Sequence, residues 1–489
     1  MVESSMVEEY DTEAMTLEEP SGEGSVPKGR DEGAIPDLLR VGEIEHDFLA
    51  HIDTTIHEPV IFTDSFIRFQ LDHQGFLNPY SRLCFSLKNT TNTGAADKHR
   101  ASYPINVGSG AIFSRVTLKI GGKTITEIED FGHFHQYKSQ FLAGEINKER
   151  EQVLSGRMMA HAQVFGNASQ TKYLDSNNDQ NDVGTTSWRN GLDTNREYNQ
   201  DNLQWNDWAL VNREGIFSIT LEELLPVLRR TALPLYMLNS DQAVQIELTL
   251  AENDARYVTQ LNDANKVMQI NRPDCRIIAD YTTYDQPIMD RYAQENKNIS
   301  WTFMDYQLTK LSVTQASATT FSRNVGGAGR LVPRVFCGIE QDGQTSANLL
   351  NKYCAQGTAA AGGNYTNVTT NIKKNDQFLY PIDRSNAALH FHGVKDTEGM
   401  IPFVTSDEYS GQGSELTEFF FEKVDQEVAL ANKFFWLGYK MVDNERVGTR
   451  GLEITSQYPA LPAGGTWRCY IEAIKVAVMN EGRFDCYYA

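Results

Sequence analysis

The sequence predicts an all-β protein built from two consecutive sandwich domains. The chain has 489 residues, more than one hydrophobic core usually supports. Short segments of alternating apolar and polar residues recur along it, separated by turns rich in Gly, Pro and Asn. Few segments have the spacing of a helix. This combination favours sandwiches or barrels over helical or mixed folds.

In the first half, several segments alternate with the period of a strand. They are 67–71, 83–87, 116–120 and 244–250, and 275–281 is a further candidate. Gly121–Gly122 predicts a tight turn after the third of them. The spacing of Phe134, Tyr137, Phe141 and Leu142 then predicts a helix. Thr220 and Glu223 stand at the spacing of a capping box, which predicts a short helix that Pro226 ends.

In the second half, strands resume at Trp301 and continue through 306–313, 331–339 and 467–488, with a hairpin turn at 480–482. Cys469 and Ile471 lie on one phase of the last long segment, whereas Val476 and Val478 lie on the other. This change of phase predicts a β-bulge. Two long polar segments, 166–207 and 340–378, are expected to be excursions between strands.

Composition predicts the domain limits. Residues 1–40 are acidic and nearly free of aromatic residues, which predicts a disordered arm. The polar segment 282–298 is the expected boundary between a first domain at 41–290 and a second at 291–489. The N-terminus lacks the apolar stretch of a secretion signal, and no window has the length of a transmembrane helix.

Charge and cysteine content exclude several kinds of protein. The formal net charge is −21 and basic residues do not cluster, which argues against a nucleic-acid-coating surface and against direct sequence-specific nucleic-acid binding. The acidity also means that two copies of the chain repel each other. The six cysteines form no CxxC pair, so we expect reduced thiols rather than disulfides or zinc ligands; they are Cys84, Cys275, Cys337, Cys354, Cys469 and Cys486.

Two His-x-His pairs are the main candidates for a metal site. Residues i and i+2 share a face on a strand, but they diverge on a helix. His133 and His135 lie at the predicted helix start. His390 and His392 are expected on a strand and superficially resemble a cupin motif, but Ser385 stands near the position of its Gly and Glu398 comes late.

Two further segments that could suggest a catalytic or phosphate-binding site have simpler explanations as a turn and a helix cap. The Gly-rich segment 326–330 lacks the Gly-Lys-Ser/Thr of a phosphate loop, and Glu222–Glu223 fits helix capping. We therefore predict no catalytic residues, no cofactor and no metal.

Two stretches carry a resemblance to a known family. Ala111–Ile128, AIFSRVTLKIGGKTITEI, resembles the passage of strand, Gly-Gly turn and Ile in the first jelly roll of double jelly-roll major capsid proteins. Leu225–Leu250, with Leu233–Pro234–Leu235 before an alternating strand, is similar to the corner of the same domain. YIEAIKVAVMNEGRF, residues 470–484, looks like the closing hairpin of the second roll. Within this family, the sequence most resembles the capsid proteins of polinton-like viruses and virophages.

The resemblance implies a fold and a function. Two jelly-roll sandwiches stand in tandem, with a few short helices and long loop insertions. Three chains form a homotrimer of pseudo-hexagonal outline, a capsomer, and capsomers tile the icosahedral shell of a DNA virus. The implied partners are neighbouring capsomers, a separate vertex (penton) protein and minor capsid proteins. The implied location is the virion, assembled inside the infected cell, and no enzymatic activity is implied.

Two alternatives remain at this point. One is a two-domain β-sandwich that binds a ligand, or a cupin-like metalloenzyme, using 166–207 or 340–378 as the ligand face. Such a protein is expected to be a monomer or dimer that carries metal or sugar. The other is a vertex or minor capsid protein, but the length argues against it because those usually have a single jelly roll.

Overall fold

The computed structural model describes residues 50–91, 101–102, 109–139, 154–155, 216–229, 231–252, 258–259, 266–313, 319–341, 368–380, 383–385, 387–398, 436–441, 445–458 and 465–489. The predicted acidic arm at 1–40, the segment 166–207 and Cys354 lie outside these ranges. The five other cysteines are free thiols, four of them buried.

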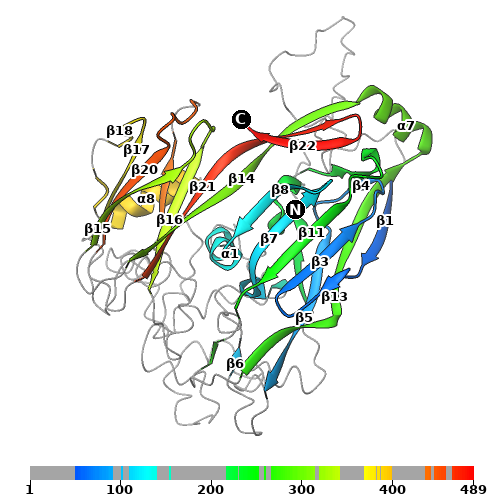
Figure 1. The fold of residues 1–489 in the computed structure, drawn as a ribbon, viewed down its shortest axis with the longest axis horizontal. Helices are drawn as coiled ribbons and strands as arrows, with labels where there is room; N and C mark the ends of the chain where they lie inside the picture. Colours follow the sequence, from blue (N-terminus) through cyan, green and yellow to red (C-terminus); the bar gives the residue numbers. More distant parts are fainter. Residues whose placement is uncertain are drawn as a thin grey trace, which may run out of the picture. The chain divides into compact units, whose positions relative to one another are not determined.

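Two antiparallel sheets are built from residues 50–284 (Figure 1). In sheet A, β1 pairs with β13, β13 with β5, and β5 with β9. Strand β4 pairs with β13 on the edge opposite β1, and β10 pairs with β4. In sheet B the order is β2-β3-β11-β7-β8. The bounds in sheet A are β1 Ala50–His57, β4 Phe76–Leu77, β5 Arg82–Thr91, β9 Ile216–Thr220, β10 Leu233–Pro234 and β13 Lys266–Tyr284. Those in sheet B are β2 Ile61–Phe62, β3 Phe66–Leu71, β7 Phe113–Ile120, β8 Lys123–Glu129 and β11 Val244–Leu250.

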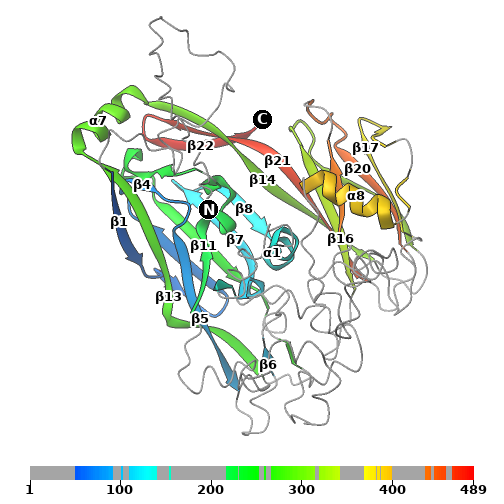
Figure 2. The same ribbon diagram turned by 180° about the vertical axis from the view of Figure 1, so that it is seen from behind.

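A second pair of sheets is built from residues 298–488 (Figure 2). Sheet D has the order β14-β21-β16-β19, with β22 on β21, and sheet E has the order β15-β20-β17-β18. The bounds are β14 Asn298–Val313, β15 Thr319–Gly326, β16 Arg334–Gln341, β17 Thr369–Lys374, β18 Gln377–Phe378, β19 Leu437–Lys440, β20 Leu452–Tyr458, β21 Gly465–Asn480 and β22 Arg483–Tyr488. A small separate pair joins β6 Ala101–Ser102 to β12 Val258–Thr259.

The two halves have the same strand order. We number β1, β3, β5, β7, β8, β9, β11 and β13 as the first to eighth strands of the first half, and β14 to β21 as those of the second. In both halves one sheet has the order first-eighth-third-sixth, and the other has the order second-seventh-fourth-fifth. Eight strands in two such sheets form a jelly roll. The predicted all-β fold of two jelly rolls is therefore confirmed.

Helices occupy matching places in the two rolls. Helix α1, Phe131–Ser139, follows the fifth strand β8, and helix α8, Ala387–Glu398, follows the fifth strand β18. Helix α7, Gln286–Glu295, joins β13 to β14, within the segment expected to be the domain boundary. Short helical turns are η3 Ser109–Ile112, α5 Leu221–Leu224, η9 Pro226–Leu228 and η10 Leu235–Met237.

The predicted strands form because their apolar residues alternate onto one buried face. Ile67, Phe69 and Leu71 of β3 are at most 2% exposed, and the residues between them are more exposed. The turn between β7 and β8 needs glycine: Gly121 and Gly122 have φ of 57° and 79°, and Ile120 pairs with Lys123 across them.

The core of the first roll extends onto strands of the second. Ile299, Trp301 and Phe303 of β14 belong to the same buried cluster as Ile125 and Ile128 of β8. Met479 of β21 and Phe484 of β22 join this cluster as well. The other end of β21, with Trp467, Cys469 and Ile471, lies in the core of the second roll. These long strands therefore hold the two rolls together by burying apolar surface in both.

The predicted bulge in β21 is wrong. The pairing of β14 with β21 runs without a shift from Asn298↔Asn480 to Val313↔Gly465. The odd-numbered residues stay buried along the whole strand, from Cys469 and Ile471 to Ala477 and Met479. Lys475 lies between them on the same face and is buried too. A buried lysine thus gave the false impression of a change of phase.

Three further expectations differ from the structure. Thr220 stands before α5 but makes no side-chain capping hydrogen bond, so the capping box does not form. The predicted excursion at 340–378 includes the end of β16 and all of β17 and β18, and 342–367 lies outside the described residues. Strand β1 was not predicted, since Ile52 and Ile56 alternate on a face that is exposed. Among the described residues, no helix is both long and apolar enough to cross a membrane.

Candidate functional site

Helix α1 is enclosed between its own roll and the outer face of sheet D. All of its residues from Phe131 to Tyr137 are buried, although its sequence, FGHFHQYKS, is not strongly apolar. One side contacts η3 and β7 of the first roll. The other side meets side chains of β14, β16 and β21 that point away from the core of the second roll. We call the contact of Asp130 and α1 with sheet D the seam.

Aromatic side chains form the centre of the seam. Phe134 of α1 packs edge-to-face against Tyr306 of β14, with ring centroids 4.5 Å apart. Tyr137 stacks on Phe336 of β16 at 3.9 Å and 8°. Trp436 Nε1, next to β19, donates a hydrogen bond to Gln136 Oε1 at 3.0 Å. Aromatic pairs add about 0.5–1.5 kcal/mol each beyond their buried area, so this centre fixes the two rolls in one arrangement.

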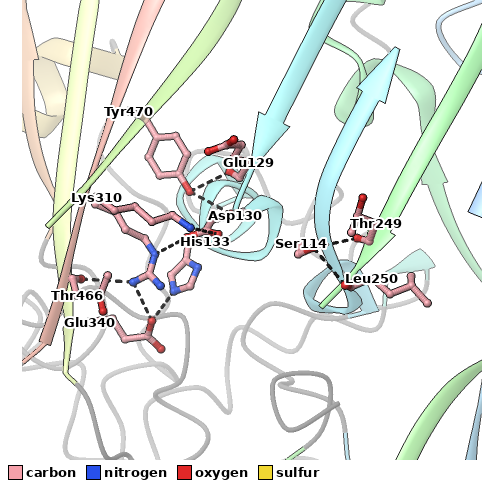
Figure 3. Close-up of polar contacts among 11 residues, drawn as sticks. Ser114, Glu129, Asp130, His133, Thr249, Leu250, Lys310, Glu340, Thr466 and Tyr470 are labelled. Carbon is pink, nitrogen blue, oxygen red and sulfur yellow. Dashed lines mark hydrogen bonds and ion pairs between the residues drawn. The ribbon is translucent and has the colours of Figure 1, made fainter. Parts of the chain in front are cut away.

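Charged side chains form one border of the seam (Figure 3). Asp130 accepts from Lys310 Nζ at 2.7 Å and from Arg468 Nε at 2.8 Å. Arg468 also donates to Glu340 Oε2 at 3.0 Å, and the same carboxylate oxygen lies 2.5 Å from His133 Nε2. Asp130 and His133 belong to the first roll, and the other three belong to the second. The border is thus a charged chain that crosses between rolls.

Burial and charge set the protonation of this border. Burial raises the pKa of Asp130, but Arg468, His133 and Lys310 outweigh burial, so the net pKa lies below its usual value. For His133, burial lowers the pKa first and Arg468 lowers it further, against the opposing effect of Glu340. At neutral pH we therefore expect an ionised Asp130, with Arg468 as the central cation.

A fully buried carboxylate forms the opposite border. Glu472 of β21 is 0% exposed and lies 3.0 Å from Arg334 Nε and 4.0 Å from Lys138 Nζ. Tyr306 donates a long hydrogen bond to Glu472 at 3.5 Å. Arg334 also donates to the carbonyl of Thr397 in α8, at 3.2 Å. The seam is therefore linked through Arg334 to the helix of the second roll.

A buried lysine joins the rolls beside the seam. Lys475 Nζ lies 3.0 Å from Asp305 Oδ2 and also donates to the carbonyl of Ile125 in β8. Asp305 further accepts from Thr126 of β8 at 2.8 Å and from Tyr488 at 3.0 Å. A buried pair of this kind needs such extra hydrogen bonds to offset its desolvation.

The two predicted His-x-His pairs occupy the two matching helices. The second pair lies in α8, not in a strand, so His390 and His392 point to different sides. His390 is 1% exposed, its Nε2 lies 2.9 Å from the carbonyl oxygen of Val368, and burial lowers its pKa to about 4. His392 is exposed. In the described part of the chain, no group of three or more His, Cys, Asp or Glu side chains is placed to hold a metal ion.

Sequence reasoning noticed both histidine pairs but missed that the surrounding residues are also shared. The residues are His-Phe-His-x-x-Lys in both helices, 133–138 and 390–395. The seam itself was not predicted, because it joins residues far apart in the sequence. The shared hexapeptide does not mark the seam, because His133 contacts sheet D whereas His390, at the same position of the hexapeptide, contacts its own roll.

The fold is similar to those of solved viral capsid structures, although no protein-family model and no curated protein sequence matches the chain. The 3.5 Å cryo-EM structure of the Sputnik virophage matches with a TM-score of 0.56 and 10% identity, over 97% of this chain and 93% of that chain. VP54 of PBCV-1, as fitted into a reconstruction of Sputnik, gives 0.53 and 12%, over 91% and 98%. The Faustovirus major capsid protein gives 0.50 and 9%, over 89% and 92%. This chain therefore has the double jelly-roll fold found in major capsid proteins.

Proposed function

We propose that this chain is the major capsid protein of an icosahedral DNA virus. In this role it is a structural protein of the virion without enzymatic activity. The observation that carries the proposal is the repeat itself: two jelly rolls of the same strand order, joined by a packed and ion-paired seam. The fold likeness to capsid structures of Sputnik and PBCV-1 supports it.

The repeat suits a subunit that tiles a shell. Because each chain has two similar rolls, three chains together have six. Six similar rolls fit a homotrimer of pseudo-hexagonal outline. A ring of three copies uses two different surfaces that close on each other. Such capsomers contact their neighbours in the shell, a separate vertex protein and minor capsid proteins. We assign residues 1–40 to an arm, 41–290 to the first roll and 291–489 to the second, with α7 at the boundary.

The ligand-binding or cupin-like alternative has less support. A cupin site needs its two histidines on one face of a strand, and here both pairs are in helices. His133 contacts Glu340 and His390 contacts a backbone carbonyl, so each is engaged in packing the fold.

Imaging and metal analysis test this proposal together. The purified full chain is examined by negative-stain electron microscopy, and its metal content is measured by mass spectrometry. We expect particles of pseudo-hexagonal outline and no stoichiometric metal. Folded single-chain particles that carry one metal ion per chain would contradict the proposal and favour the metalloenzyme.

A further inference from the structure

Helices α1 and α8 are equivalent parts of the two rolls. Each follows the fifth strand of its roll. Each also turns a histidine toward the segment just before the fourth strand. His135 lies against Gly110, where an added Cβ would be 2.9 Å from its ring, and His390 contacts the carbonyl of Val368. The second histidine of the pair in α1 and the first histidine of the pair in α8 therefore contact the same part of their own rolls.

The opposite sides of these helices differ. In α1 this side is buried against sheet D in the seam. In α8, Leu389, His392 and Asp396 follow one another at spacings of three and four residues, so they share a face. All three are exposed, and Leu389 is 39% exposed. In the part of the chain that the structure describes, this side of α1 is thus buried against sheet D, whereas these three residues of α8 are exposed.

Sheet A is the counterpart of sheet D. Its outer face is exposed along β1 and at the start of β9, whereas Cys84 and Ser86 on this face are buried. Ile52 and Ile56 of β1 are 65% and 56% exposed, and Ile216 of β9 is 40% exposed. The cross-strand row Ile56–Ile278–Arg82–Thr220 runs over this face through four strands. Exposed isoleucines on an edge strand are a feature that proteins usually avoid unless another chain covers them.

From this repeat we propose that α8 of one copy docks on the outer face of sheet A of a second copy. This contact between two chains would be equivalent to the contact between α1 and sheet D within one chain. The inference rests on the proposed capsid function and names the surface that joins the subunits. In a closed ring of three copies, three contacts within chains would then alternate with three contacts between chains.

Charge complementarity favours a second copy over another partner. The chain carries a net charge of −21, so copies approach best where carboxylates are few or already engaged. On this face, Asp280 accepts from Thr54, and Asp274 accepts from Ser86. The outer face also carries two guanidinium groups, those of Arg82 and Arg276.

These guanidinium groups match the carboxylate that α8 presents. Arg276 Nε is buried without a hydrogen-bond partner among the described residues. Arg276 lies on the eighth strand of its roll, as Arg468 does in the seam, where it meets Asp130. Asp396, in the last turn of α8 and on its exposed side, supplies a carboxylate for a pairing between chains, whereas Asp130 stands just before α1.

Cross-linking tests where the two copies meet. Leu389→Cys and Ile56→Cys are combined in one full-length chain, which is treated with a short bis-maleimide that joins two thiols. Each single variant and the wild type give the background from native cysteines. The matched control combines Leu389→Cys with Phe378→Cys, because Phe378 is 54% exposed but lies on sheet E. We expect covalent dimers and trimers on denaturing gels only for the first pair.

A charge reversal tests the strength of the same contact. Asp396→Arg should raise the dissociation constant of the trimer at least about tenfold, because it places like charges together. Glu295→Arg on α7, also at an exposed acidic residue, should leave the constant within about twofold. Circular dichroism confirms that each variant is folded.

The outcomes separate this inference from the capsid proposal. If the wild type is a trimer but the Leu389→Cys/Ile56→Cys pair cross-links no more than the control, the docking surface is wrong and the trimer stands. The docking surface is also wrong if Asp396→Arg and Glu295→Arg behave alike. If the wild type is a stable folded monomer, the proposed function and this inference both fail.

Discussion

His133 Nε2 lies 2.5 Å from Glu340 Oε2, and this contact joins the helix of the first jelly roll to the third strand of the second. The same carboxylate accepts from Arg468, whose guanidinium also binds Asp130. Both carboxylates and the arginine are largely buried. The relative placement of the two rolls therefore depends on a chain of charges in which each member compensates the next.

Removing Glu340 should weaken the seam. Glu340→Ala leaves Arg468 with one carboxylate instead of two and removes the partner of His133. Breaking a buried pair costs about 3–5 kcal/mol, and we expect about 2–3 kcal/mol because Asp130 still binds Arg468. The midpoint of urea unfolding measures the loss. Glu453→Ala, which removes a 38%-exposed partner of Lys373, is the control and should cost less than about 1 kcal/mol.

The pair of Lys475 and Asp305 should show strong coupling. Lys475→Met leaves the carboxylate of Asp305 buried with only hydroxyl donors, at a cost of about 3–5 kcal/mol. The double variant Lys475→Met/Asp305→Leu removes both charges and should be more stable than the single variant. Denaturation of the four proteins of this cycle measures the coupling. Additive losses would show that the two side chains do not act as a pair.

The aromatic centre of the seam should contribute through packing. Tyr137 is 0% exposed and stacks on Phe336, so Tyr137→Ala should destabilise the protein by about 3–5 kcal/mol. Tyr487→Ala at a 58%-exposed site should change stability by less than about 0.5 kcal/mol. Thermal unfolding followed by near-ultraviolet circular dichroism compares the two. Equal shifts would mean that the stack does not hold the rolls together.

His390 should make stability depend on pH. Its pKa is lowered from 6.5 to about 4, chiefly by burial. Between these values the unfolded chain binds a proton that the folded chain does not, so stability falls as the pH falls from 6.5 toward 4. Each unit of the shift corresponds to about 1.4 kcal/mol.

Replacing His390 checks this dependence. His390→Gln keeps a polar group near the carbonyl of Val368 but does not titrate, so its stability should change less over this range of pH. His51→Gln, on the exposed part of β1, is the control for the substitution itself and should change the stability at pH 7 by less than about 0.5 kcal/mol. The unfolding midpoint at pH values from 7 to 4 is the measurement. A wild-type slope in His390→Gln would assign the dependence to other groups.

The sequence allowed most of the fold to be predicted, because alternation of apolar residues is a local signal. β3, β5, β7 and β11 all have it, and each buries one face. β1 lacks a buried apolar face, since its isoleucines point outward. The end of β21 was misread because Lys475 takes a buried position that the pattern assigns to an apolar residue.

The candidate site could be predicted only in part. His133 and His390 were recognised as unusual, but the histidine–carboxylate contact joins residues 207 positions apart. No local pattern encodes such a contact. The place of the second pair was also wrong, because His390 and His392 lie in a helix whose match to α1 becomes evident only from the strand order.

The mass of the folded protein in solution tests the central claim most directly. The full chain is measured by multi-angle light scattering across a range of concentrations. We predict a stable species of three times 55.1 kDa, the mass of a trimer. A folded protein of 55.1 kDa at every concentration would contradict its role as a capsid subunit.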